Sequence, residues 1–385
     1  QVKEARREAV LKLLEERVRH RVAEGVLEVH DQLITKPAGI QPREAGASAE
    51  GRVRVLCRTR EQAEAALRLG WLDEITLDFL EVHGLVEAVT AVKSAGVRCV
   101  VATPRVLKPD EERMWRFFLK LEADALLVRS AGMLQQLLDL GGPGSNPADG
   151  TQHKVPELYG DFSLNVANII SAWDMLDGEG LARLTLTHDL DADQLCELAE
   201  GLGTYSSKLE VIIHQHLPIF HTEHCVFCRF LSDGQNYKDC GHPCESNTVH
   251  LRDHSQADHL VLADMGCRNT VFNAQAQSGA AYVSKMLKSG FESFRIELVD
   301  EPAHQVAPLL NGYRKLVEGS LSSSELWGEL EALTDANGVP QGVSAGSLKP
   351  GTEHDRKGPL KKTAAQVDPR WNKDSVQKLK VVAKG

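Results

Sequence analysis

Five of the eight cysteines in this 385-residue chain lie within one stretch, residues 221–273. Cys225 and Cys228 form a C-x-x-C pair, Cys240 and Cys244 form a C-x-x-x-C pair, and Cys267 follows a polar, histidine-rich spacer. Thiolates at such spacings can converge on one metal centre, because a short loop lets two sulfur atoms face the same point. The pattern therefore predicts a metal site in this stretch.

Three interpretations of the cluster compete. It could be a set of buried or disulfide-paired cysteines, or a structural zinc site with four sulfurs or with His221, His224 or His242 replacing one of them. The third interpretation is an iron–sulfur cluster held by four of the five thiolates. Spacing does not separate zinc from iron–sulfur, because both accept tetrahedral sulfur.

Residues 209–297 resemble the signature of peptidase family U32, the collagenase-like peptidases. The resemblance rests on the cysteine segment EHCVFC…CG-x-PC…CRNTVFN, on Cys267-Arg268, and on the triplet Arg295-Ile296-Glu297. It is strongest to the C-terminal part of the long, multi-barrel members. The resemblance implies a TIM-like barrel, a 4Fe-4S cluster on four cysteines, and a part in hydroxylating transfer RNA, ribosomal RNA or a quinone precursor.

Matched in chain order, the resemblance implies Cys225, Cys228, Cys240 and Cys267 as ligands, with Cys244 as the alternate. The shorter family members space the first two cysteines more widely, so the choice of four among five stays open. Zinc is the alternative metal.

Composition bounds the partners and the compartment. Of the residues, 42% are hydrophobic. The net charge is −10 and the pI is near 5.9, so the chain as a whole has no positive field that would attract nucleic acid. A local basic patch that binds nucleic acid is still compatible with this composition. No apolar run approaches the roughly 20 residues that span a membrane. Isolated cysteines beside a clustered set favour a reducing intracellular compartment, cytoplasm or organelle stroma. The chain starts at Gln1 in an apparent mid-helix pattern, so we expect an upstream domain of a longer chain.

The chain divides into three predicted parts: a helix and linker (1–51), a barrel (52–334) with the Cys-rich insertion 221–273, and a flexible basic tail or linker (335–385). Within the barrel, short β-branched runs alternate with helical stretches. The eight predicted strands are 53–57, 74–78, 98–102, 125–128, 157–162, 183–187, 209–213 and 294–298. This order fits an α/β fold, a closed (β/α)8 TIM-like barrel, and an open doubly wound sheet is the competitor.

Segments that follow barrel strands lie at the C-terminal mouth, where catalytic groups collect. If 209–213 is the seventh strand, the inserted thiols lie over that mouth. At the other strand ends we expect catalytic roles for Asn165, His214, His216 and Glu297. Three arginines at strand ends are expected to bind a substrate phosphate or carboxylate bidentately: Arg58, Arg105 and Arg129.

These observations favour an iron–sulfur barrel enzyme that assists hydroxylation of RNA or of a small aromatic substrate. The first alternative is a peptidase, as the family name states, although the sequence lacks the G-x-S-x-G and H-E-x-x-H motifs of serine and zinc hydrolases. The second alternative is a non-catalytic scaffold stapled by zinc.

Overall fold

The computed structural model describes residues 2–19, 39–43, 50–146, 153–254, 256–333, 342–351 and 378–383. The chain forms two compact units, residues 1–40 and 41–385. In the first unit, α1 (Val2–Arg19) is the predicted N-terminal helix, and its apolar side chains between residues 10 and 14 are exposed. Among the helices of the described residues, none combines the length and apolar composition that crossing a bilayer requires.

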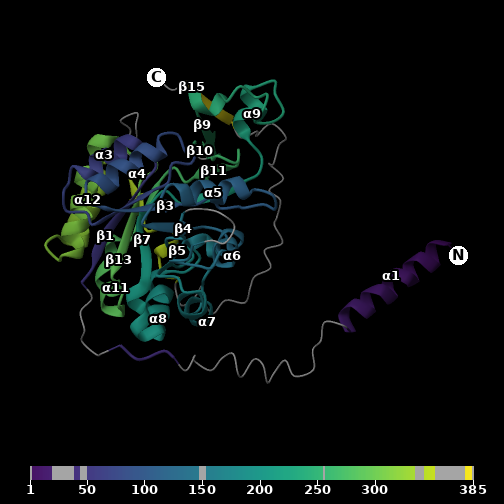
Figure 1. Ribbon diagram of the computed structural model, residues 1–385, viewed down its shortest axis with the longest axis horizontal. Helices are drawn as coiled ribbons and strands as arrows, with labels where there is room; N and C mark the ends of the chain where they lie inside the picture. The colour runs from purple at the N-terminus through teal and green to yellow at the C-terminus, as the bar shows by residue number, and fades with distance from the viewer. Residues whose placement is uncertain are drawn as a thin grey trace. The chain divides into compact units, whose positions relative to one another are not determined.

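The second unit contains a closed parallel barrel (Figure 1). Its strands pair in chain order, and the last of them pairs with both the first and the seventh. This double pairing excludes the open sheet and confirms the predicted barrel. The strands are β1 (Arg52–Cys57), β2 (Glu74–Leu77), β3 (Arg98–Ala102), β4 (Ala125–Val128), β5 (Glu157–Gly160), β6 (Arg183–Thr185), β7 (Leu209–Gln215) and β13 (Ser293–Glu297).

Helices cover the barrel, and several begin where the sequence provides a cap. Capping boxes start three of them, at Thr59, Asp191 and Ser322, each with Gln or Glu three residues later to close the reciprocal hydrogen bonds. The helices are α3 (Arg60–Leu67), α4 (Leu85–Ser94), α5 (Glu112–Lys120), α6 (Ala131–Asp139), α7 (Ile169–Trp173), α8 (Ala192–Leu202), α11 (Val283–Ser289), α12 (Ala303–Val317) and α13 (Ser323–Glu331).

The barrel interior is charged. TIM-type barrels usually fill with layers of branched aliphatic side chains. Here the inward positions of β13 carry Arg295 and Glu297, and Arg295 contacts Asp161 after β5 and Glu210 on β7. Burying a charge is costly unless it is paired with an opposite charge, and each of these groups has such a partner inside the barrel. The network links the barrel interior to its mouth.

The Cys-rich insertion and β15 (Lys378–Ala383), from near the C-terminus, form a separate antiparallel sheet in the order β15-β9-β10-β11-β8. We call residues 218–272 the cysteine subdomain. Its strands are β8 (Pro218–Thr222), β9 (Asn247–Arg252), β10 (Asp258–Ala263) and β11 (Asn269–Phe272), with short helices α9 (Val226–Leu231) and α10 (Pro243–Ser246). A small core around Phe227, Val249 and Val261 holds it together.

Parts of the predicted flexible tail are structured. β14 (Val343–Ser344) pairs with β12 (Ala276–Ser278), and β15 (Lys378–Ala383) pairs with β9. A hydrogen bond from the Ser347 N–H to Gln277 Oε1 (2.7 Å) and the buried side chain of Leu348 fix the first of these segments to the barrel. The expected flexibility therefore does not extend over 342–351 and 378–383, and residues 352–377 lie outside the described residues.

Candidate functional site

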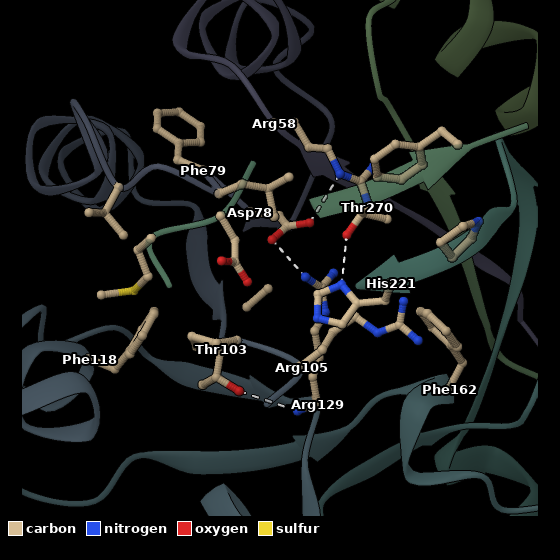
Figure 2. A pocket seen from close by; sticks show the side chains of 18 residues that line it. Arg58, Asp78, Phe79, Thr103, Arg105, Phe118, Arg129, Phe162, His221 and Thr270 are labelled. Carbon is tan, nitrogen blue, oxygen red and sulfur yellow. Dashed lines mark hydrogen bonds and ion pairs between the residues drawn. The ribbon is translucent and has the colours of Figure 1, made fainter. Parts of the chain in front are cut away.

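Two of the three predicted substrate arginines are tied to carboxylates at the barrel mouth. Arg129 lies 2.7 Å from Asp78 Oδ1 and 2.8 Å from Asp161 Oδ2. Arg58 lies 3.1 Å from Asp78 Oδ2 (Figure 2) and 2.9 Å from Glu297 Oε2. All five side chains are at most 5% exposed. Arg58 and Arg129 therefore hold the mouth together, and their charges are already balanced.

Glu297, a predicted catalytic residue, lies inside the same network. Its Oε1 faces Arg295 and its Oε2 faces Arg58, so both oxygens have cationic partners. Burial alone would raise the pKa of Glu297, but Arg295 and then Arg58 hold that pKa below its ordinary value. A carboxylate with a lowered pKa is a weak base. The geometry thus gives Glu297 a structural role.

Arg105 differs from the other two arginines. Its guanidinium carbon lies 5.1 Å from the centre of the Phe162 ring, and its Nη1 is buried without a hydrogen-bond partner in the described residues. Burial, and then repulsion from Arg129, lower the pKa of Arg105. Arg105 is therefore the mouth arginine that an anionic ligand would satisfy.

Arg105 lines a cavity of about 40 Å³ that lies between the barrel mouth and the cysteine subdomain. We call it the mouth cavity. His221 Nδ1 lies 2.9 Å from Thr270 Oγ1, while its Nε2 is buried with no partner recorded in the described part of the chain. Burial, then Arg105 and Arg268, lower the pKa of His221 to about 4, so its ring is neutral at pH 7. Four aromatic rings help to line the cavity: Phe79, Phe118, Phe162 and Phe272 (Figure 2).

Arg268 fastens the cysteine subdomain to the barrel. Its side chain is 1% exposed, with Nε 2.9 Å from Glu223 Oε1 and Nη2 3.1 Å from Glu111 Oε1. The N–H of Met265 donates to the Leu80 carbonyl, which lies beyond β2 (2.7 Å). These contacts hold the segment that carries Cys267 against the loops of the mouth.

The clustered thiols lie close enough to influence one another: Cys225 affects the pKa of Cys228, Cys244 and Cys267. The N–H of Cys228 donates to Cys225 Sγ over 3.5 Å. The pKa of Cys267 is raised by burial and then by Cys225 and Cys240, and that of Cys228 is raised by burial and then by Cys240 and Cys225. As they stand, however, no three His, Cys, Asp or Glu side chains of the described residues are arranged to hold a metal ion. The thiols therefore lie near one another, but their present positions do not form a metal-binding geometry.

Cys244 differs from the other four thiols in having Glu81 as its main electrostatic neighbour. Burial, then Glu81 and then Cys225, raise its pKa to about 12. A neighbouring carboxylate disfavours the thiolate that a metal requires. The alternate ligand is therefore in the least favourable surroundings.

The remaining predicted catalytic residues lie away from the mouth cavity. His214 and His216 line a second cavity of about 360 Å³, because β7 extends past the barrel layer to pair with β12. Asn165 is exposed and adopts φ 58° after the turn Phe162–Leu164, a left-handed position that Asn tolerates. The expected single mouth site is thus divided among three places.

Sequence reasoning missed two acidic residues, Asp161 and Glu301. Asp161 directly follows β5 and pairs with Arg129 and Arg295, and Glu301 follows β13 by four residues and lines the second cavity. A search for carboxylates at the end of each predicted strand and in the few residues after it would have found both.

Comparisons with known proteins bear on the C-terminal half of the barrel. The model of peptidase family U32 matches residues 154–337, just under half of the chain. This range contains the cysteine subdomain, β7 and β13. The search of curated proteins found no match.

Solved structures of low similarity also match. A thiamine phosphate pyrophosphorylase from Pyrococcus furiosus shares 10% identity over 70% of this chain and 97% of its own, with a TM-score of 0.37. An HpcH/HpaI aldolase from Desulfitobacterium hafniense shares 11% identity over 70% of this chain and 93% of its own, with a TM-score of 0.36. Scores this low carry no argument about function.

Proposed function

Residues 154–337 belong to peptidase family U32, and from this premise we propose that the protein is an iron–sulfur barrel enzyme. It assists hydroxylation of an anionic aromatic substrate, either RNA or a small molecule. The observation that carries the proposal is the proximity of four thiols, in which Cys225 and Cys240 raise the pKa of Cys228 and Cys267, beside a barrel mouth that holds an aromatic cavity and an unsatisfied cation.

The ligand set that we propose is Cys225, Cys228, Cys240 and Cys267. Four thiolates are the usual ligands of a 4Fe-4S cluster, and such a cluster supplies one-electron transfer when bound. Zinc accepts the same four thiolates, so it is the competing occupant. Cys244 stays outside the set because its surroundings include Glu81.

Buried donors next to Cys267 in the sequence support this fit. Arg268 Nη1 and Asn269 Nδ2, from the two residues after Cys267, are buried without hydrogen-bond partners among the described residues. Asn269 Oδ1 accepts the Val226 N–H (2.7 Å), which orients the start of α9 next to Cys225. N–H groups close to cluster sulfurs stabilise the reduced form and tune its potential, so unsatisfied donors here suit a sulfur-rich cofactor.

The mouth cavity supports an anionic substrate with an aromatic ring. Arg105 offers N–H groups to a phosphate or carboxylate, and the surrounding phenylalanines offer faces for stacking. Because the whole chain carries a net charge of −10, recognition of an anion has to be local. At about 40 Å³ the cavity admits only a small group, so a ring would bind after neighbouring side chains move.

Metal analysis of protein purified without oxygen tests the cofactor. We expect about four irons and four inorganic sulfides per chain, as a 4Fe-4S cluster requires. Single Cys→Ser variants at positions 225, 228, 240 and 267 should lose the cluster, whereas Cys244→Ser is the matched control and should keep it. Stoichiometric zinc in place of iron would support the scaffold alternative and refute the proposal.

Nucleoside mass spectrometry tests the reaction. RNA from cells that lack the gene is compared with RNA from the same cells complemented by wild type, by Cys267→Ser or by Arg105→Met. A nucleoside heavier by one oxygen that returns only with wild type supports an RNA substrate. If its level is the same with Cys267→Ser, the cluster has no role in the hydroxylation. If no such nucleoside changes, the same comparison of small-molecule extracts tests the other substrate class. The peptidase alternative rests on the family's name alone, and no contact in the site favours it.

A further inference from the structure

The second cavity, of about 360 Å³, lies among the end of β7, the loop after β13, and the cysteine subdomain. His214, His216 and Glu301 line it together. The two histidines are two residues apart on one strand, so their side chains leave the same face. Glu301 comes from the loop between β13 and α12.

Each imidazole ring has a partner at Nδ1. His216 Nδ1 lies 2.7 Å from the main-chain carbonyl of Asn273, which can only accept a hydrogen bond, so Nδ1–H is the donor. His214 Nδ1 lies 3.2 Å from the Tyr313 hydroxyl, which is also 2.7 Å from Ser278 Oγ and 3.2 Å from the Ile213 carbonyl. The neutral ring of His216 therefore carries a lone pair on Nε2, and the neutral ring of His214 does so when its proton lies on Nδ1.

Those lone pairs face a buried carboxylate oxygen. Glu301 Oε1 lies 3.8 Å from His214 Nε2 and 3.6 Å from His216 Nε2, and the Glu301 side chain is 9% exposed. Both separations exceed the range of about 2.7–3.2 Å for an N–H···O hydrogen bond. Oε1 is buried with no hydrogen-bond partner in the described residues, while the N–H of Val299 donates to Oε2 (2.6 Å).

Two imidazole nitrogens and one carboxylate oxygen thus converge beside a cavity. A buried carboxylate is unfavourable unless a positive charge lies beside it, and either a protonated histidine or a metal cation between the three atoms supplies that charge. We propose that His214, His216 and Glu301 form a second metal site, separate from the thiols, that takes a divalent transition-metal cation such as Fe²⁺ or Zn²⁺.

Ligand type and spacing suit such an ion. Two ligands about 2.1 Å from one metal lie about 3.0–3.4 Å apart at octahedral or tetrahedral angles. The observed separations of 3.6 and 3.8 Å are slightly longer, so metal binding has to draw the side chains together. Without that movement, no three His, Cys, Asp or Glu side chains in the described part of the chain are arranged to hold a metal ion.

The surroundings also match known metal sites. A histidine ligand usually donates its second ring N–H to a carbonyl or another acceptor, as His216 does to the Asn273 carbonyl, and His214 Nδ1 has the Tyr313 hydroxyl beside it. Two histidines and one carboxylate leave coordination positions open to water or substrate, as in non-haem iron and catalytic zinc sites. A cluster held by four cysteines lacks such open positions, so this site would add a function that the thiols do not provide.

Titration of the metal-free, full-length protein with Co²⁺ alone tests the inference. Co²⁺ bound by nitrogen and oxygen ligands gives visible d–d bands without the charge-transfer absorption that thiolate ligands add. We expect one such ion per chain in wild type and also in Cys267→Ser. Loss of the cluster in Cys267→Ser therefore leaves this readout unaffected, which separates the two proposals.

Variants assign the ligands. Glu301→Gln and His216→Asn should each weaken Co²⁺ binding by about 100-fold or more, and Tyr313→Phe by about 10–100-fold through loss of the group that orients His214. His304→Asn, at an exposed position on α12, is the matched control and should bind like wild type. Circular dichroism confirms the fold of each variant.

Two outcomes would overturn the inference. One is that wild type shows only thiolate-bound Co²⁺, which would mean that protons alone occupy the three acceptors. The other is that both Glu301→Gln and His216→Asn, correctly folded, bind Co²⁺ as tightly as wild type.

Discussion

Replacing Arg295 with Met tests whether the charged barrel interior depends on one central cation. Arg295 is 1% exposed and contacts Asp161, Glu210 and Glu297, together with the Thr185 hydroxyl (3.1 Å). Methionine keeps most of the side-chain length and removes the charge. The variant therefore changes the electrostatics of the interior more than its packing.

The magnitude follows from the partners that remain. Each carboxylate keeps one other arginine: Asp161 keeps Arg129, Glu297 keeps Arg58, and Glu210 keeps Arg183. The loss should therefore resemble the breaking of one buried ion pair, about 3–5 kcal/mol, and not of three. That is a large share of the total of about 5–15 kcal/mol that stabilises a typical domain.

The effect should depend on pH in a defined direction. In wild type, burial raises and Arg295 lowers the pKa values of Asp161, Glu210 and Glu297, and all three remain below their ordinary values. Their stabilisation is present above the unfolded pKa, about 4, and is lost below it. Without Arg295 these pKa values rise, so the folded variant binds protons before the unfolded chain does. Its deficit should shrink between pH 7 and pH 5.

Urea unfolding followed by tryptophan fluorescence at both pH values provides the measurement. Arg60→Met is the control, because Arg60 forms an exposed pair with Glu64 four residues away, and its midpoint should match wild type. A deficit for Arg295→Met below about 1 kcal/mol at pH 7 would refute the assignment, since a broken buried pair costs several times more. A deficit that grows between pH 7 and pH 5 would contradict the predicted direction of the pH dependence.

Three further predictions concern the mouth cavity and the cysteine subdomain. Arg105→Met should abolish the increase in melting temperature that inorganic phosphate gives wild type. Arg314→Met, at a partly exposed position, is the control and should retain that increase. Equal responses of the two variants to phosphate would mean that Arg105 does not bind the anion. The ring of His221 should titrate near pH 4 in NMR spectra and at a higher pH in Arg105→Met, because burial and then Arg105 lower its pKa; a wild-type midpoint above 6 contradicts this. Deletion of residues 378–385 should speed amide hydrogen exchange in β9, which loses its β15 partner, with little change at β11 on the far side of β10; unchanged exchange in β9 would argue against the pairing.

The amino-acid sequence by itself determined the barrel and the location of the thiols. Continuous β-branched runs, helix caps such as Thr59 and Asp191, and the spacing of cysteines are local signals, because each depends on neighbours a few residues away. All eight predicted barrel strands are present, and the Cys-rich insertion follows the seventh as expected. β14 and β15 were missed because such short segments become strands only when another strand's edge receives them.

Only the tertiary structure decided which polar groups are satisfied. Arg58, Arg105 and Arg129 look alike in the sequence, yet the carboxylates that pair with two of them come from other strands and leave Arg105 without one. The same holds for Arg295 and Asp161, which meet across 134 residues of chain, and for Glu301, which reaches the histidines of β7 from the loop after β13. The physical reason is that closing a barrel brings distant strand ends together, and the charge of each end is balanced by neighbours that no local pattern can reveal.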